Sequence, residues 1–265
     1  MSELPLAGRT RAELADIVLR SAWDGDPAAA RCILHDVPDL CRDSFLLAVV
    51  TENIEAVRDH LATDPDAAAR RGGPIDWQPL LYLAYARLAP DQSHVIDVAR
   101  ALLDHGADPN AHFADDWGNT FTALTGVIGE GEGDKPPHPQ ALALATLLIE
   151  RGADPFDRQA LYNTSVTRDD TSWLDFLWDH SQRRGLTERW RAVPSTPEIG
   201  GKLPLNALDY LLGNAVAYGH LKRAEWLMNH GAHPDGRHAY SERPLIEEAR
   251  VHGHSEMADL LRKRL

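Results

Sequence analysis

The feature that most constrains the fold of this chain is a segment that recurs three times. Each copy is a leucine-rich amphipathic run that ends in Gly-Ala-x-Pro, at residues 101–110, 146–156 and 225–235. Leucines at helical spacing mark the buried face of a helix. A glycine just past the last turn can adopt the left-handed conformation that satisfies the terminal carbonyls, and the following proline cannot continue the helix. We therefore expect left-handed backbone, and destabilisation by valine, at three glycines: Gly106, Gly152 and Gly231.

Weaker copies of the same ending extend the pattern along the chain. Residues 32–39 and 58–66 keep the helical run, the proline and an acid but lose the glycine. The prolines that mark the endings are Pro38, Pro65, Pro109, Pro155 and Pro234. The interval before Pro234 is about two units long, which indicates a degenerate copy between residues 173 and 185. Units of this kind bury their apolar faces only by stacking on their neighbours.

This pattern resembles the ankyrin repeat family, whose units carry Thr-Pro-Leu-His-x-Ala in the first helix and Gly-Ala-Asp-x-Asn after the second. Residues 78–84, Gln-Pro-Leu-Leu-Tyr-Leu-Ala, match the first motif at the proline, the leucine and the final alanine, and residues 122–125 keep its threonine and leucine. Gly-His, which joins the two helices, occurs at 219–220 and 253–254. The arrangement is similar to that of stand-alone bacterial ankyrin proteins with long, divergent repeats. The resemblance is nearly absent from residues 159 to 202.

The resemblance implies an all-α, ankyrin-like helical repeat solenoid of about six to seven helix-turn-helix units, with finger loops and one long acidic insertion. The expected helix pairs are 11–24 with 27–37, 44–50 with 54–63, 77–88 with 94–105, 121–128 with 139–151, 172–180 with 187–192, 205–218 with 221–230, and 244–252 with 256–263. They form one domain, 1–265, with approximate units 11–42, 43–73, 74–118, 119–160, 161–200 (degenerate), 204–240 and 241–265 (C-terminal cap). Histidines are expected to meet free carbonyls at three helix ends: His105, His230 and His252.

Composition limits the class of partner and the cellular compartment that we expect. The chain has 265 residues, 43% of them hydrophobic, and a formal net charge of −13 at pH 7. Negative charge disfavours contact with phosphate backbones, so we expect a protein partner, for which a basic surface is the complement, and no nucleic acid. No run approaches the roughly 20 apolar residues of a membrane span. We therefore expect a cytoplasmic monomer without membrane contact, in which Cys32 and Cys41 are small buried residues; a disulfide or redox role is the alternative.

An acidic insertion at residues 129–139 separates the two helices of the fourth pair. Its acids, Glu130, Glu132 and Asp134, alternate with glycines, and His138 follows. One interpretation is a contact with a partner, because insertions in repeat proteins map to one face. The alternatives are a loop that is acidic because it is solvated, and a site for a hard cation such as calcium.

The sequence contains none of the common catalytic or nucleotide-binding motifs, such as a phosphate-binding loop or Gly-x-Ser-x-Gly. We therefore expect a non-catalytic protein-interaction module that needs no cofactor and no metal. The alternative is an enzymatic or small-molecule site formed around residues 129–139 and 160–170, where the acidic insertion would meet Asp169 and Asp170. That alternative requires these segments to converge on one face and to hold a carboxylate with a shifted pKa.

Family geometry places the contact surface on the first helices and on the fingers that follow Gly-Ala-x-Pro, at 110–119, 156–163 and 235–243. Polar-tipped aromatic residues on such a surface are the types that anchor interfaces. The candidate residues are Tyr82, Tyr85, His112, Phe113, Asp115, Asp116, Trp117, Glu130, Glu132, Tyr162, Asn163, His238 and Tyr240. For Phe113 and Trp117 we favour packing between neighbouring units, with partner contact as the alternative. Tyr82 and Tyr85 are three positions apart, so one of them is expected to face the groove.

Overall fold

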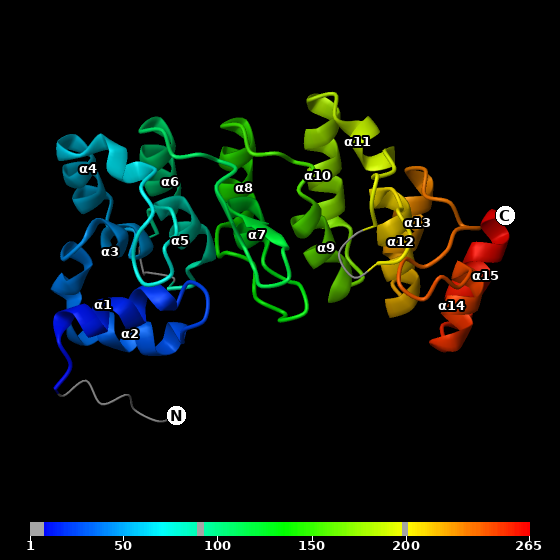
Figure 1. The fold of residues 1–265 in the computed structure, drawn as a ribbon, viewed down its shortest axis with the longest axis horizontal. Helices are drawn as coiled ribbons and strands as arrows, with labels where there is room; N and C mark the ends of the chain where they lie inside the picture. Colours follow the sequence, from blue (N-terminus) through cyan, green and yellow to red (C-terminus); the bar gives the residue numbers. More distant parts are fainter. Residues whose placement is uncertain (1–7, 89–92, 198–200) are drawn as a thin grey trace. The chain divides into compact units, whose positions relative to one another are not determined.

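The computed structural model describes residues 8–88, 93–197 and 201–265, and most of its regular structure is helical (Figure 1). Its contacts divide the chain into two compact units. Of the described residues, the first unit holds 8–88, 93–113, 121–128 and 137–153, and the second holds 114–120, 129–136, 154–197 and 201–265. The single domain and its repeat boundaries stay predictions.

The first unit is built from four helix pairs. They are α1 (Arg11–Arg20) with α2 (Pro27–Asp36), α3 (Phe45–Val50) with α4 (Ile54–Thr63), α5 (Pro79–Tyr85) with α6 (Val95–Asp104), and α7 (Ala123–Ile128) with α8 (Ala141–Glu150). Helices α3, α5 and α7 pack in one row and α4, α6 and α8 in a second, as Figure 1 shows. Two short 3-10 helices, η1 (Pro38–Arg42) and η2 (Pro65–Ala68), begin at prolines that the repeat pattern marks.

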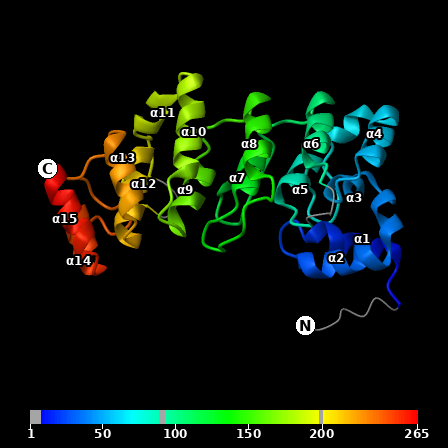
Figure 2. The same ribbon diagram turned by 180° about the vertical axis from the view of Figure 1, so that it is seen from behind.

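The second unit also consists of packed helices. It contains α9 (Arg158–Val166), α10 (Ser172–Arg183), α11 (Thr187–Arg191), α12 (Ala207–Tyr218), α13 (Leu221–Asn229), α14 (Leu245–Val251) and α15 (Ser255–Arg264). The inner helices α9, α12 and α14 pack in succession, and α13 packs on α15 (Figure 2). Paired helices in both units confirm the expected all-α repeat fold.

The fifth helix pair differs from the expectation. We expected 172–180 with 187–192, whereas the pair is α9 with α10, and α11 is a short addition. Residues 158–163 are therefore the start of a helix and not part of a finger. Asp157 caps this helix by accepting a hydrogen bond from the backbone amide of Ala160 at 2.9 Å. The segment expected to hold a degenerate copy, 173–185, contains most of α10, which is followed by Gly185 with φ +67°; its identity as a repeat copy stays a prediction.

The repeated helix endings are confirmed in the backbone. The φ angles of the three predicted glycines are +87° at Gly106, +111° at Gly152 and +107° at Gly231. Nδ1 of His105 and Nδ1 of His230 lie 2.8 Å and 2.7 Å from carbonyl oxygens one turn earlier in their helices, as expected. His252 differs, because its Nε2 lies 3.3 Å from a carboxylate oxygen of Glu248.

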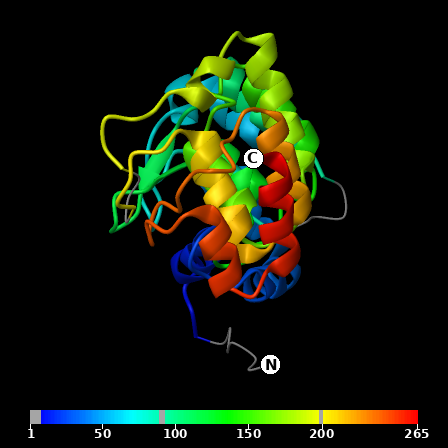
Figure 3. The ribbon, with the colours of Figure 1, turned by 90° about the vertical axis from the view of Figure 1, so that its right-hand side faces the viewer.

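Three loops concern the site. The hairpin finger, residues 112–122, holds the strands β1 (His112–Ala114) and β2 (Thr120–Thr122), which pair with each other. The acidic loop comprises residues 129–136. The C-terminal finger, residues 235–243, lies between α13 and α14, on the side of α14 that faces away from α15 in Figure 3.

Two further expectations concern the cysteines and the membrane. Both cysteines are free thiols, but Cys32 is exposed and Cys41 is half-buried, so the expectation that both are buried is wrong. Helix α2 turns Ile33 to the core, and Cys32 falls on its outer face. No helix in the described part of the chain has both the length and the apolar character that a bilayer crossing requires.

Candidate protein-interaction surface

The tip of the hairpin finger is held in one conformation by Asp115. Its carboxylate accepts hydrogen bonds from the backbone amide of Trp117 at 2.9 Å, and from the backbone amide and the side-chain amide of Asn119, both at 2.8 Å. Burial is the largest single influence and opposes the ionised carboxylate, but the hydrogen bonds together outweigh it and hold the pKa of Asp115 below its usual range. The tip is thus a rigid, ionised turn.

Trp117 projects from this turn into solvent. Its side chain is 80% exposed, and the neighbouring Asp116 is exposed as well. The favoured interpretation, that Trp117 packs between neighbouring units, is therefore wrong. The reason is local: the hydrogen bonds to Asp115 hold Trp117 in a turn at the tip of the hairpin, where its indole stays in solvent. His112, at the start of β1, is also exposed.

Phe113, in contrast, packs as expected. Its ring lies 4.2 Å from that of Trp77 and 5.2 Å from that of Phe121, centroid to centroid, and both pairs are stacked. Trp23 meets the ring of Phe113 edge-on at 4.8 Å. These rings hold the base of the finger, which leaves Phe113 little surface to offer a partner.

Tyr82 and Tyr85 lie in the core of the first unit. Tyr82 is 0% exposed and Tyr85 is 8% exposed, so the expectation that one of them faces a groove is wrong. The hydroxyl of Tyr82 donates to the carbonyl of Gly72 at 2.9 Å, and that of Tyr85 donates to the carbonyl of Thr122 at 3.0 Å. Both tyrosines are therefore structural, because their hydroxyls anchor the backbone at Gly72 and at Thr122.

The acidic loop is fastened to α9 by Asn163. The side-chain amide of Asn163 donates to the carbonyl of Gly129 at 3.0 Å, and its backbone carbonyl accepts from the amide of Gly131 at 3.1 Å. Beside it, the hydroxyl of Tyr162 donates to a carboxylate oxygen of Glu132 at 2.7 Å. Burial, together with this hydrogen bond to an anion, raises the pKa of Tyr162. The loop is therefore an ordered part of the surface.

The three acids of this loop lie in different surroundings. Glu132 binds Tyr162, and a carboxylate oxygen of Asp134 lies 3.6 Å from the guanidinium of Arg168. Glu130 is only 9% exposed, and burial raises its pKa although Arg168 and Arg223 oppose the shift. In the described residues no three His, Cys, Asp or Glu side chains are grouped to hold a metal ion. The cation interpretation therefore finds no ligand set here.

The acidic loop and the segment 160–170 do converge, as the alternative site requires. Arg223 of α13 is 1% exposed and donates to the carbonyl of Asp170 at 2.7 Å and to the hydroxyl of Thr164 at 3.2 Å. Asp169 accepts from the backbone amide of Arg223 at 3.0 Å and so caps the start of α13. Burial lowers the pKa of Arg223 to about 10, with Glu130 and Asp169 opposing. No pattern in the sequence singled out this buried arginine.

Tyrosine rings form a row across the inner helices of the second unit. The ring of Tyr210 on α12 lies 6.4 Å from that of Tyr162 on α9 and 6.1 Å from that of Tyr240 in the C-terminal finger. The hydroxyls of Tyr210 and Tyr240 are hydrogen-bonded to each other. Tyr210 is buried, whereas Tyr162 and Tyr240 are half-buried and offer part of their rings to solvent. Tyr210 was not among the candidate residues, because its contact with Tyr162 joins two helices that are far apart in the chain.

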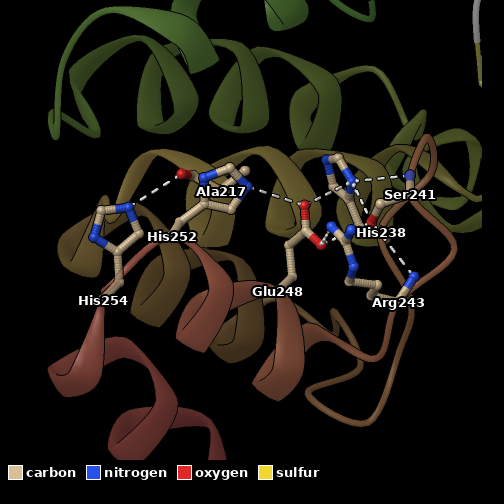
Figure 4. Close-up of polar contacts among 7 residues, drawn as sticks. All are labelled: Ala217, His238, Ser241, Arg243, Glu248, His252 and His254. Atoms are coloured by element: carbon tan, nitrogen blue, oxygen red, sulfur yellow. Dashed lines mark hydrogen bonds and ion pairs between the residues drawn. The ribbon is translucent and has the colours of Figure 1, made fainter.

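The C-terminal finger is clamped by the buried carboxylate of Glu248, which is 2% exposed (Figure 4). It accepts from the hydroxyl of Ser241 at 2.7 Å and from the guanidinium of Arg243 at 3.2 Å. His238, which we expected on the contact surface, is only 8% exposed, and its Nδ1 lies 3.3 Å from Glu248. Burial lowers the pKa of His238 although Glu248 opposes the shift. His238 therefore fixes the finger more than it displays a side chain.

Paired helices with fingers between them, repeated in each unit, define a helical-repeat protein. The fold is the ankyrin-repeat fold. The chain is similar to the ankyrin repeat domain of Bcl-3, described as a unique member of the IkappaB protein family, with 19% sequence identity and a TM-score of 0.51. The similarity covers 96% of this chain and 99% of the Bcl-3 chain. No protein-family profile and no curated protein sequence matches the chain.

Proposed function

We propose that this chain is a non-catalytic protein-interaction module, and that its contact surface lies on the fingers and inner helices of the second unit. The observation that carries the proposal is Trp117, an 80% exposed indole on a turn held by three hydrogen bonds to Asp115. A large side chain on a rigid turn loses little conformational entropy on binding, and tryptophan is enriched among the residues that dominate binding energy.

The tyrosine row supports the same proposal. Tyr162 and Tyr240 are half-buried, and each is oriented by a hydrogen bond from or to its hydroxyl. Oriented aromatic rings with polar tips supply contact area at low entropic cost. The acidic loop adds Glu132 beside Tyr162, which would complement a basic partner. A protein partner is also what an ankyrin-repeat fold suggests, by analogy with proteins that share it. The cytoplasmic monomer stays a prediction.

The test places a photo-crosslinking amino acid at Thr120, an exposed residue of the hairpin finger, in cells that produce the protein. The matched control carries it at Val251, which is 58% exposed on α14. We expect a cross-linked protein from position 120 only. With that protein purified, Trp117→Ala and Tyr240→Ala should each weaken binding about fivefold or more, whereas Val251→Ala should not. Equal products from both positions, or binding that ignores both aromatic substitutions, would contradict the proposal.

The small-molecule site is the second candidate, because its segments converge. In the described chain, three buried polar atoms there have no hydrogen-bond partner: Nε of Arg223, Oγ1 of Thr167 and Nδ1 of His220. The other polar groups of the cluster stabilise the fold, since Asp169 caps α13 and Arg223 binds Thr164. Screening the purified chain against metabolites by thermal shift tests this candidate. A hit whose effect disappears in Arg223→Lys but persists in Trp117→Ala would favour it over the protein-interaction module.

A further inference from the structure

The chain around the hairpin finger carries acidic side chains and neither lysine nor arginine. Over residues 101–134 the seven acids are Asp104, Asp108, Asp115, Asp116, Glu130, Glu132 and Asp134. Two of them, Asp115 and Asp116, immediately precede the exposed Trp117 in the chain. Asp104 and Asp134 are ion-paired with Arg151 and Arg168, and Glu130 is buried, so the negative charge at the tip rests on Asp115 and Asp116. These two carboxylates attract positive charge and repel negative charge. The occupant of this tip is therefore expected to be cationic.

The two carboxylates have different roles at the tip. Both oxygens of Asp115 already accept hydrogen bonds within the turn, so Asp115 contributes its fixed negative charge. Asp116 is exposed beside Trp117 and can offer its oxygens to a partner. The indole adds an electron-rich face, which attracts a cation placed over it. The tip thus combines an aromatic face, a free carboxylate and a fixed charge on consecutive residues.

We propose that the hairpin tip binds an arginine side chain from a flexible, basic segment of the partner, with the guanidinium stacked on Trp117 and paired with Asp116. This inference rests on the proposed interaction function and specifies its partner. Arginine fits better than lysine because its guanidinium is planar, stacks on aromatic faces and keeps N–H groups free at its edge for a carboxylate. An apolar pocket on the partner would use the indole but would leave Asp116 desolvated beside it, which is unfavourable.

The test titrates the full-length protein with a labelled peptide in which arginine alternates with serine, and follows fluorescence anisotropy. Matched peptides replace arginine with lysine, which keeps the charge, or with citrulline, which keeps the shape and loses the charge. We expect the arginine peptide to bind about two- to fivefold more tightly than the lysine peptide, and the citrulline peptide to bind most weakly. Trp117→Ala should abolish the preference for arginine over lysine, and Asp116→Asn should weaken binding of both charged peptides.

Two control variants separate this site from general attraction to an acidic protein. Asp179→Asn removes one exposed charge from α10, and Val251→Ala removes an exposed apolar side chain from α14. Both should leave affinity and preference unchanged. Because Trp117 and Asp116 are exposed, their variants are expected to keep the wild-type circular dichroism spectrum. Equal binding of the arginine and lysine peptides, or equal effects of Asp116→Asn and Asp179→Asn, would overturn the inference.

The cross-linked partner distinguishes failure of this inference from failure of the proposed function. Each arginine in the partner's cross-linked segment is changed to lysine, and binding is measured with wild type and with Trp117→Ala. A loss caused by one such change, seen with wild type only, supports the inference. If Trp117→Ala weakens binding but no arginine matters, the interaction surface stands and the arginine assignment falls. If Trp117→Ala has no effect, both fall.

Discussion

Two glutamates of the second unit are almost completely buried, and their surroundings act on them in opposite directions. Glu248 is surrounded by donors: Ser241, Arg243 and His252 all lie within hydrogen-bonding or ion-pairing distance of it. Although burial opposes its charge, these contacts lower its pKa. Glu130 lies near Arg168 and Arg223, yet burial dominates and raises its pKa. Burial alone therefore does not decide the state of a carboxylate; the number of donors around it does.

Glu248→Gln should destabilise the protein by about 1–3 kcal/mol at neutral pH, because it weakens charge-assisted hydrogen bonds at a buried position. The folded pKa of Glu248 is lowered, so its contribution is fully present above the unfolded value of about 4.3 and is lost as the pH falls through the folded pKa. Urea unfolding of wild type and variant should therefore converge at acid pH. Glu247→Gln, the exposed neighbour on the same helix, is the control and should stay within about 0.5 kcal/mol.

Glu130→Gln should have the opposite sign. Since the folded pKa of Glu130 is raised, the protein is stabilised as the pH falls from above the folded pKa toward the unfolded value. At neutral pH the variant is expected to be at least as stable as wild type, by up to about 1 kcal/mol, because it removes a poorly solvated charge. The difference should shrink on acidification. A clear loss of stability at neutral pH would show that the pairing with Arg168 and Arg223 outweighs the burial of the charge.

At the scale of elements, the repeated Gly-His pair shows how neighbouring repeats of the second unit pack against each other. Gly219 ends α12 with φ +74°, and a Cβ atom built there would lie 2.7 Å from Nδ1 of His254. Nε2 of the same ring lies 3.1 Å from the carbonyl of Ala217, which Figure 4 shows at the end of α12. The histidine of one repeat therefore occupies the space that the glycine of the preceding repeat leaves open. The glycine of the second Gly-His pair, Gly253, has φ +78°, and a Cβ atom built there would meet nothing within 4 Å.

Gly219→Ala should therefore cost more than Gly253→Ala. Both substitutions place a side chain in left-handed backbone, which costs about 1–2 kcal/mol. Only Gly219→Ala must also displace the ring of His254, so its loss of unfolding free energy should be larger by about 1 kcal/mol or more. In a double-mutant cycle, His254→Ala should remove most of that difference. Equal losses for the two glycines would mean that the ring moves aside freely.

At the scale of the whole molecule, the excess of acid has a kinetic consequence. The net charge is −13, and the hairpin finger lies in a stretch without lysine or arginine. If the partner is basic, attraction accelerates its association, and salt screens that attraction because the Debye length falls from about 10 Å at 0.1 M to about 3 Å at 1 M. We expect the association rate constant, measured by stopped flow, to fall about tenfold or more over that range while the dissociation rate changes less.

A pair of charge reversals tests which part of the molecule attracts the partner electrostatically. Asp116→Lys and Asp179→Lys change the net charge equally, but only the first lies at the hairpin tip. Asp116→Lys should slow association several-fold more than Asp179→Lys, since proximity to the binding site sets the local potential. If both reversals slow association to the same degree, net charge steers the partner and the finger has no special part in the encounter.

The sequence by itself determined the local structure and the repeat. The leucines of the three copied segments, such as Leu102, Leu148 and Leu227, are each 0% exposed, and the glycines that follow are left-handed. These features are encoded within one or two helical turns, where spacing and conformational preference are enough to predict them. The same reasoning failed at residues 158–163, where an expected finger is helical, because Asp157 forms a helix cap that the repeat pattern does not contain.

The tertiary structure alone decided which side chains are available to a partner. Tyr82, Tyr85 and His238 are of the residue types that bind partners, but they are buried, whereas Trp117, which we expected to be packed, is exposed. Exposure depends on what the folded chain places against a residue: Phe113 and Trp77 against Tyr85, Glu248 against His238, and solvent around Trp117. The row from Tyr162 through Tyr210 to Tyr240 is of this kind, since its rings come from α9, from α12 and from the C-terminal finger. Local spacing carries no record of such contacts, and only the folded chain brings them together.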